Sequence, residues 1–169
     1  MAVLEIVTIP DAVLRRKARK VTAFDKEFQI LVDDMVETMR AAPGVGLAAP
    51  QVGVSLRLIV VEFGSEEDEE APKKLYIVAN PEIVMASEEK VTGIEACLSV
   101  PGLVGEVERH KSIIVRGLNR QGKPIKVKAE GWLARIFQHE IDHLDGIIYT
   151  DRASRVWQPK EDEELALAD

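Results

Sequence analysis

Two of the three histidines in this 169-residue chain lie four positions apart, in the sequence Gln-His-Glu-Ile-Asp-His at residues 138–143. Residues four apart share one face of a helix, so His139 and His143 can bind one metal ion together. Glu140 follows the first histidine directly, where it can accept a proton from a water on that metal. A surface helix that carries these residues by chance is the alternative, but the scarcity of histidine in the chain favours metal chemistry.

The residues around this motif have the spacing of a helix that packs against a core. Apolar residues recur at intervals near 3.6, and Gly146 is well placed to end the helix. Buried polar side chains need partners, and a metal ion is the simplest partner for two histidines and a glutamate. We expect residues 147–149 to leave the helix as a short strand or an extended segment. The apolar positions are Leu133, Ile136, Phe137, Ile141 and Leu144.

A catalytic site of this kind requires a third protein ligand and leaves a fourth position for water or substrate. The metzincin pattern matches as far as Gly146, but Tyr149 occupies the position of its third ligand and is a poor substitute. A thermolysin-like site would require a glutamate on a later helix, and the later glutamates lie in a charged tail without a helical core pattern. Cys97, the one cysteine, is the other candidate, although a lone cysteine is more often a small buried hydrophobe.

The segment around this cysteine is one of three that resemble the signature motifs of the peptide deformylases. Residues 44–51, Gly-Val-Gly-Leu-Ala-Ala-Pro-Gln, are similar to the pattern GxGxAAxQ. Residues 95–99, Glu-Ala-Cys-Leu-Ser, are similar to EGCLS, and residues 138–143 to QHExxH. The motifs occur in the order that the family has, and the resemblance extends over about residues 6–152. Together the three motifs are far more specific than any one of them.

The resemblance implies an enzyme that removes the N-formyl group from the N-terminal formyl-methionine of newly made polypeptides and releases formate. It implies one divalent metal ion, Fe²⁺ in the cell, with Zn²⁺ or Ni²⁺ able to replace it. Glu140 would transfer the proton, and the side chain of Gln51 and the backbone N–H of Leu98 would stabilise the oxyanion. The metal ligands would be Cys97, His139 and His143.

The resemblance also implies that Val45 and Gly46 hold the substrate main chain in extended form, as an added strand. Glu95, in the second motif, is included among the predicted substrate-binding residues. Three residues on the predicted helix lie seven, four and three positions before the first histidine of the motif and can share its face. We predict that they line the pocket for the methionine side chain, with packing or surface roles as the alternative: Trp132, Arg135 and Ile136.

Two other functions fit parts of the pattern. One is a zinc-dependent peptidase that cleaves internal peptide bonds, because this is the usual meaning of HExxH. The other is a metal-binding or peptide-binding protein of the same fold without catalysis. The joint presence of Gln51, Glu140 and all three candidate ligands argues against the second.

The composition fits one domain, which we place at residues 1–152, followed by an acidic C-terminal tail at residues 153–169. A single cysteine excludes an intramolecular disulfide and indicates a reducing compartment. Residues 1–6 lack signal-peptide features and no apolar run approaches transmembrane length. We therefore expect a cytoplasmic protein with no membrane partner, of bacterial type or a mature organellar form. The net charge of −7 argues against a long nucleic-acid-binding face.

The element pattern predicts an α+β fold, in which mostly antiparallel sheets pack around the C-terminal motif helix. A short helix or turn is expected at residues 11–18, and a longer helix to residue 39 that Asp25 caps. Residues 44–53 are expected to form a loop, and the acidic block at 65–70 a solvated one. A hairpin loop is expected at 119–123. The predicted strands are 56–63, 75–79, 83–86, 104–108, 112–118 and 125–129.

Ala96 departs from the family pattern, which has glycine beside the cysteine. A Cβ hinders positive φ, so alanine is harmless there only if the backbone has negative φ. We predict that it does.

The C-terminal tail generates a first prediction about partners. Many deformylases end in a longer helix with basic residues that is associated with docking at the ribosome, whereas residues 160–169 here carry one base and five acids. Phosphate repels an acidic segment, so we expect deletion of the residues after Gln158 to leave ribosome association unchanged. Co-sedimentation with ribosomes at physiological salt measures this, and a clear loss in the shortened chain would contradict it.

Overall fold

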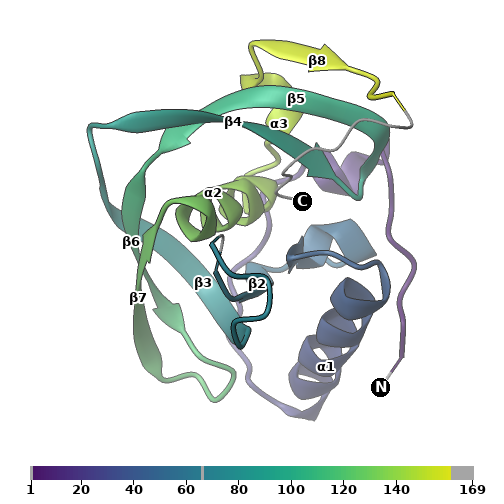
Figure 1. The fold of residues 1–169 in the computed structure, drawn as a ribbon. Coiled ribbons are helices and arrows are strands. Elements are labelled where there is room, and N and C mark those ends of the chain that lie inside the picture. The colour runs from purple at the N-terminus through teal and green to yellow at the C-terminus, as the bar shows by residue number, and fades with distance from the viewer. Residues whose placement is uncertain (1, 66, 161–169) are drawn as a thin grey trace.

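The computed structural model describes residues 2–65 and 67–160, and its strands form two antiparallel sheets around helix α2 (Trp132–Leu144) (Figure 1). The first sheet has the spatial order β1 (Gly46–Ala48), β2 (Leu58–Phe63), β3 (Lys74–Ala86), β6 (Ser112–Leu118) and β7 (Pro124–Glu130). The second has the order β4 (Lys90–Cys97), β5 (Val100–His110) and β8 (Arg155–Trp157). Every ladder between these strands is antiparallel. The predicted α+β class, with sheets packed around the motif helix, is confirmed.

Helix α2 lies in the interior of the protein, and nearly all of its faces are covered by other parts of the chain. Ten of its thirteen residues are buried, and its apolar side chains pack with those of the first sheet in one core cluster. Gly146 ends the helix with φ 75°, as predicted. A Cβ there would lie 2.5 Å from the carbonyl oxygen of Arg15, so glycine also permits a close backbone contact.

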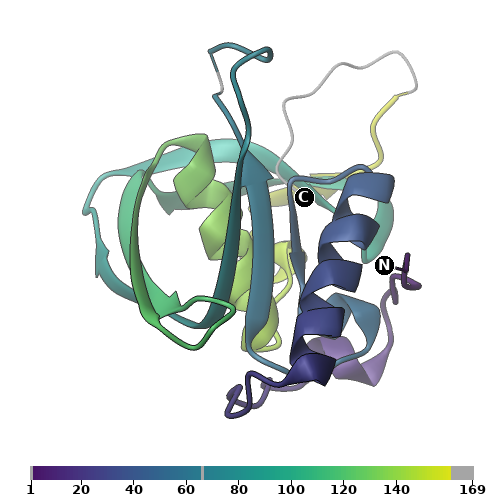
Figure 2. The same ribbon diagram turned by 90° about the horizontal axis from the view of Figure 1, so that it is seen from below.

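Helix α1 (Lys26–Ala41) covers the part of the first sheet that contains β1 and β2 (Figure 2). Its start is fixed as predicted, because the Asp25 side chain accepts a hydrogen bond of 3.0 Å from the backbone N–H of Phe28. The helix runs two residues beyond the predicted end and buries one apolar face against the sheet. The buried apolar residues are Phe28, Val32, Met35, Val36 and Met39.

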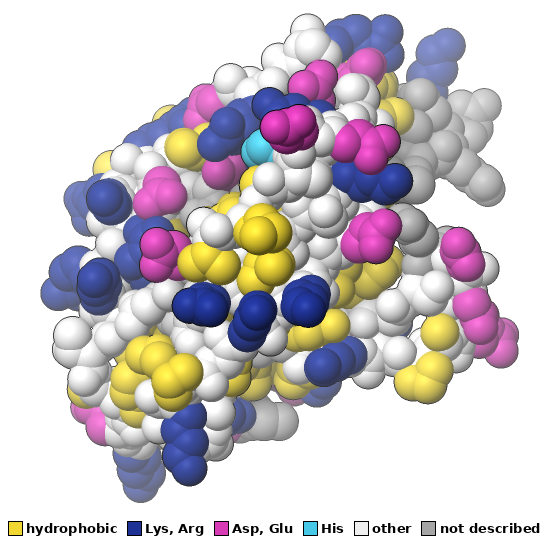
Figure 3. Space-filling view, turned by 90° about the vertical axis from the view of Figure 1, so that its left-hand side faces the viewer, with side chains coloured by type: hydrophobic (Ala, Val, Ile, Leu, Met, Phe, Trp, Pro, Cys, Tyr) yellow, Lys and Arg dark blue, Asp and Glu magenta, His cyan; other side chains and the backbone are white. Residues whose placement is uncertain are grey.

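The outer face of the first sheet is exposed and mixes basic with apolar side chains. Arg116, Lys126 and Lys128 are exposed on β6 and β7, while Val84 and Met85 on β3 are 45% and 62% exposed. Figure 3 shows both kinds of side chain on the side of the molecule that carries β6 and β7. The alternation of these strands therefore separates a solvated face from the face that meets α2.

Several elements differ from the prediction. The predicted loop at 44–53 contains β1 and a 3₁₀ turn (Ala49–Val52), and strand β4 was not predicted. The predicted strands at 75–79 and 83–86 are one strand, because a register shift between Ala79 and Glu82 carries β3 past Asn80 and Pro81. The predicted extended exit at 147–149 leads into the one-turn helix α3 (Tyr149–Arg152).

The folded part of the chain extends past the predicted boundary at residue 152. Strand β8 pairs with β5, with Trp157 opposite Val104, so residues 155–157 belong to the second sheet rather than to a tail. Residues 161–169 of the predicted tail lie outside the described residues. Within the acidic block, residues 67–70 are exposed, as expected for a solvated loop. No helix in the described parts of the chain is long and apolar enough to cross a membrane.

Candidate metal centre

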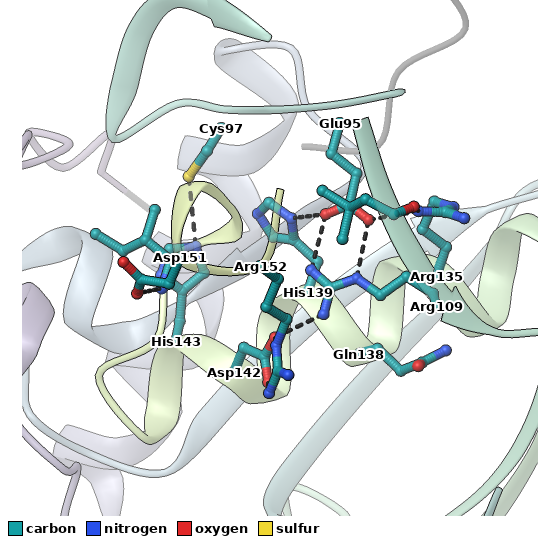
Figure 4. Close-up of polar contacts among 12 residues, drawn as sticks. Glu95, Cys97, Arg109, Arg135, Gln138, His139, Asp142, His143, Asp151 and Arg152 are labelled. Carbon is teal, nitrogen blue, oxygen red and sulfur yellow. Dashed lines mark hydrogen bonds and ion pairs between the residues drawn. The ribbon is translucent and has the colours of Figure 1, made fainter. Parts of the chain in front are cut away.

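Cys97 at the end of β4 meets two histidines of α2, and the ligand atoms of the three all lie within 4.8 Å of one another. The thiol sulfur lies 3.4 Å from Nε2 of His143, and the rings of His139 and His143 are edge to face with centroids 5.1 Å apart (Figure 4). All three side chains are buried. The structure therefore brings together the three predicted ligands from two segments far apart in the sequence.

The chemistry of these three residues fits a divalent metal ion. The Nε2 atom of His139 is buried and has no hydrogen-bond partner among the described residues, as expected for an atom that binds a metal. Burial, helped by the neighbouring His139 and by Arg109, lowers the pKa of His143 well below its ordinary value, so this imidazole is neutral and keeps a lone pair. One sulfur and two imidazole nitrogens are ligands that zinc, iron and nickel accept.

Gln51 reaches the same place from the 3₁₀ turn (Ala49–Val52) that follows β1. Its Oε1 accepts a hydrogen bond of 3.0 Å from the backbone N–H of Ala48, which fixes the orientation of the amide. The Nε2 group then donates to Ser99 Oγ at 3.2 Å and lies 3.5 Å from Cys97 Sγ. Leu98, which lies between Cys97 and Ser99 in the sequence, is in the turn that joins β4 to β5.

The backbone at Ala96 agrees with the prediction made for it. Among the described residues other than glycine, only Asn80 has positive φ. Ala96 therefore has the negative φ that any residue adopts, and the family's glycine is not required by the backbone at this position.

Glu140 is completely buried and lies directly against the backbone of β1. A Cβ placed on Gly46 would come within 2.6 Å of its Oε2 atom, a distance that forces one of the two groups to move. Val45, just before β1, is half-buried and packs against the core cluster of α2. The first motif therefore contributes a stretch of backbone that adjoins the predicted general base.

Glu95 contacts His139 at Nδ1, the ring nitrogen that is not the candidate metal-binding atom. Its Oε1 lies 2.8 Å from Nδ1 of His139, and Arg109 donates to both carboxylate oxygens at 2.8 and 2.9 Å. Burial alone would raise the pKa of Glu95, but hydrogen bonds from Arg109 and His139 outweigh burial and hold the pKa well below its ordinary range. An ionised carboxylate only accepts hydrogen bonds, so Nδ1 of His139 carries the proton and Nε2 is left for a metal.

The network continues from Arg109 to the surface. Its Nη1 donates to Asp142 at 2.6 Å, and Asp142 accepts from Arg152 of α3 at 2.7 Å (Figure 4). Burial alone would lower the pKa of Arg109, but the carboxylates of Glu95 and Asp142 raise it above its ordinary value. Sequence reasoning missed Arg109, although a signal was available: it has the same strand parity as the buried Val107.

Two predicted substrate-binding residues need correction. Glu95 is 0% exposed and both its oxygens accept from protein donors, so it orients His139 instead of contacting substrate. Arg135 is 4% exposed, and its guanidinium is enclosed by β4 and β5. The predicted pocket residue Ile136 is fully buried in the core, whereas Trp132 is half-buried at the start of α2.

A buried Cys-His-His cluster, with a glutamate beside the first histidine and an oriented amide, defines a metal-dependent hydrolase. Comparison with known families agrees, because residues 3–158 match the model of the polypeptide deformylase family. The peptide deformylase of Symbiobacterium thermophilum is 56% identical over 97% of this chain and 73% of the relative. That of Desulforudis audaxviator is 49% identical over 95% of this chain and 100% of the relative.

Solved structures show the same likeness. The peptide deformylase of Thermotoga maritima superimposes with a TM-score of 0.84 at 40% identity, covering 92% of this chain and 100% of that one. The enzyme of Ehrlichia chaffeensis in complex with actinonin has a TM-score of 0.85 at 45% identity, covering 92% of this chain and 91% of that one. The chain belongs to the peptide deformylase family. It is a metal-dependent hydrolase that removes the N-formyl group from newly made polypeptides.

The contact between β1 and the buried glutamate generates a prediction. In Gly46→Ala the new methyl group would lie 2.6 Å from Glu140 Oε2, so the carboxylate must move. A misplacement of about 1 Å costs on the order of a hundredfold in rate, and we expect kcat to fall by about that factor. Metal content should stay unchanged because the ligands are untouched, and a variant with near wild-type kcat and an intact melting temperature would contradict the assignment.

Proposed function

We propose that deformylation by this chain takes place at the centre formed by Cys97, His139 and His143, with Glu140 as the group that moves protons. The observation that carries the proposal is the convergence of three ligand atoms from two of the family motifs within 4.8 Å, with residues of the remaining motif, 44–51, next to them. A divalent ion held there supplies Lewis-acid chemistry, lowering the pKa of a water and polarising the formyl carbonyl.

Glu140 is placed to act first as a base and then as an acid. It follows the first ligand on α2, and its carboxylate lies beside the backbone of Gly46 rather than in solvent. In the proposed reaction it accepts a proton from the attacking water and returns a proton to the departing amine. The products are formate and a free N-terminus.

Gln51 and Leu98 are the proposed donors to the oxygen that gains negative charge. The hydrogen bond from Ala48 to Oε1 of Gln51 turns the NH₂ group of that amide toward Cys97, where the reacting carbonyl would lie. The backbone N–H of Leu98, in the turn that follows the cysteine, is the proposed second donor. Donors fixed in advance stabilise a developing oxyanion without reorganisation during the reaction.

Strand β1 is the proposed binding place for the substrate main chain. It is the edge strand in the spatial order of the first sheet, so one side of Gly46 and its neighbours is not paired with another strand of that sheet. An extended peptide that adds to this edge through Val45 and Gly46 would run next to Glu140.

Two substitutions distinguish the proposed role of Glu140 in proton transfer from that of Cys97 as a metal ligand. Glu140→Gln is nearly isosteric and leaves the ligands in place, so we expect it to keep its metal and its fold but to lose about a hundredfold or more in turnover. Cys97→Ala removes a ligand and should lose metal affinity and activity together.

Formate release from a formyl-Met peptide, with the acetyl-capped peptide as control, measures turnover in both variants. Metal content and melting temperature are measured on the same samples. A Glu140→Gln protein that turns over formyl-peptide at near wild-type rate would overturn the proposed mechanism.

We propose Fe²⁺ as the metal in the cell, with Zn²⁺ or Ni²⁺ able to replace it. A thiolate and two imidazoles accept all three ions, and the resemblance to the deformylases favours iron. Because Fe²⁺ at a thiolate site reacts with oxygen, we expect the activity of iron-loaded protein to decay in air and catalase or a reductant to protect it. Full activity after prolonged aeration of an iron-loaded sample, with a nickel-loaded sample as the control, would contradict this.

The proposed partners are the formyl-methionyl N-termini of nascent chains in the bacterial cytoplasm, near the ribosome. Residues 161–169, which carry all five acidic residues of the tail, lie outside the described residues. The proposal that the tail has no role in ribosome docking therefore rests on the charge of the tail alone.

A further inference from the structure

Arg135 lies on α2 one turn before His139 and is buried between that helix and the second sheet. Its Nη1 donates to Glu95 Oε2 at 2.7 Å and to the carbonyl oxygen of Val107 at 2.9 Å. Its Nη2 donates to the carbonyl oxygen of Val91 at 2.6 Å. One guanidinium therefore connects the carboxylate behind a metal ligand to the backbones of β4 and β5 (Figure 4).

Glu95 is held by two arginines in different ways. Arg109 binds both carboxylate oxygens and also pairs with Asp142. Arg135 approaches Oε2, the oxygen that does not receive the hydrogen bond from His139, and among the described residues Glu95 is the carboxylate with which it is ion-paired. Arg135 therefore constrains the far side of the carboxylate, which sets the rotation of the near oxygen toward the histidine.

Strand β4 leaves space for the Arg135 guanidinium because residue 93 is a glycine. Gly93 lies two residues before Glu95 on β4, and a Cβ there would come within 2.8 Å of Arg135 Cζ and 2.9 Å of Nε. The guanidinium also lies over the ring of Trp132, with Cζ 5.5 Å from the ring centroid. The glycine at residue 93 of β4 leaves room for the guanidinium, and the Trp132 ring on α2 packs near it.

We propose that Arg135 is a positioning residue for the metal centre. It fixes the Glu95 carboxylate so that His139 keeps its Nδ1–H donated and its Nε2 directed at the metal. This inference rests on the proposed function, in which His139 is a ligand. Arg135 acts through Glu95 and does not contact substrate, so its loss changes metal affinity and kcat rather than KM.

Arg135→Met and Arg135→Lys test the inference directly. Methionine keeps the apolar stem but removes every donor, and we expect about tenfold to a hundredfold weaker Zn²⁺ binding, the range typical for loss of a group that supports a ligand. Lysine keeps the charge but cannot reach three acceptors at once, so it should recover only part of the affinity. With saturating Zn²⁺, kcat for a formyl-Met peptide should fall in Arg135→Met while KM stays within about threefold of wild type.

Gly93→Ala tests the same contact from the other side. Its methyl group would displace the guanidinium without removing it, so Zn²⁺ affinity should fall as it does in Arg135→Met. In the double variant the second change should add little, because the clash needs the guanidinium. Arg120→Met is the matched control, since Arg120 also pairs with a carboxylate but lies in the β6–β7 loop and contacts Gln29 and Asp33 of α1. It should keep wild-type Zn²⁺ affinity.

Zn²⁺ affinity is measured by competition with a chelator, and melting temperatures are recorded for every variant. Unchanged affinity in folded Arg135→Met and Gly93→Ala would overturn the inference and leave the proposed function intact. So would a rise in KM with metal affinity unchanged, which would place Arg135 in a substrate pocket. If Arg135→Met fails to fold, Arg135→Lys and Gly93→Ala decide by the same criterion. A wild-type chain that fails to bind one Zn²⁺ would instead overturn the proposed function, and the inference with it.

Discussion

The hydrogen bond between His139 and the buried carboxylate of Glu95 is the interaction on which the metal centre depends. A buried charge without a partner costs several kcal/mol, so Glu95 can lie there only because Arg109 and Arg135 accompany it. The ionised carboxylate accepts hydrogen bonds and donates none, and this selects the tautomer of His139 that leaves Nε2 for a metal. The charges around Glu95 therefore decide which ring nitrogen of His139 is left to bind a metal.

The metal centre draws residues from both sheets, and this explains why α2 lies between them. The second sheet supplies Cys97 and Glu95, while the first supplies the strand whose glycine lies against Glu140. Gln138 joins the helix to β5 by hydrogen bonds of 3.0 and 2.9 Å to the backbone N–H and carbonyl of His110. The site is complete only when both sheets are packed on the helix. Metal binding and tertiary structure should accordingly stabilise each other.

The sequence was informative where chemistry and local pattern agree. Strand β6 was predicted at its observed bounds because its run of β-branched residues, Ile113 to Val115, favours a strand, and α1 because Asp25 caps an apolar stripe. The ligands followed from motif spacing and family resemblance. The role of Arg135 did not, because helical periodicity shows which residues share a face but not which strand covers that face. Strand β4, which provides that cover, has few buried positions and a glycine at residue 93, so its pattern is weak.

Charge balance explains how two buried arginines can lie near a site for a cation. Glu95 and Asp142 carry two negative charges, which offset the two positive charges of the buried Arg109 and Arg135. Arg152, which also pairs with Asp142, is exposed to solvent, where water screens its charge. Without the carboxylates, the guanidinium groups would repel a divalent ion through a medium that screens charge poorly. A divalent ion held by the three proposed ligands would face the Cys97 thiolate and the nearby Glu140 carboxylate, whose two negative charges would balance its own. One group of paired charges would then orient the ligands and a second would balance the metal, so that tight orientation need not weaken the attraction for the ion.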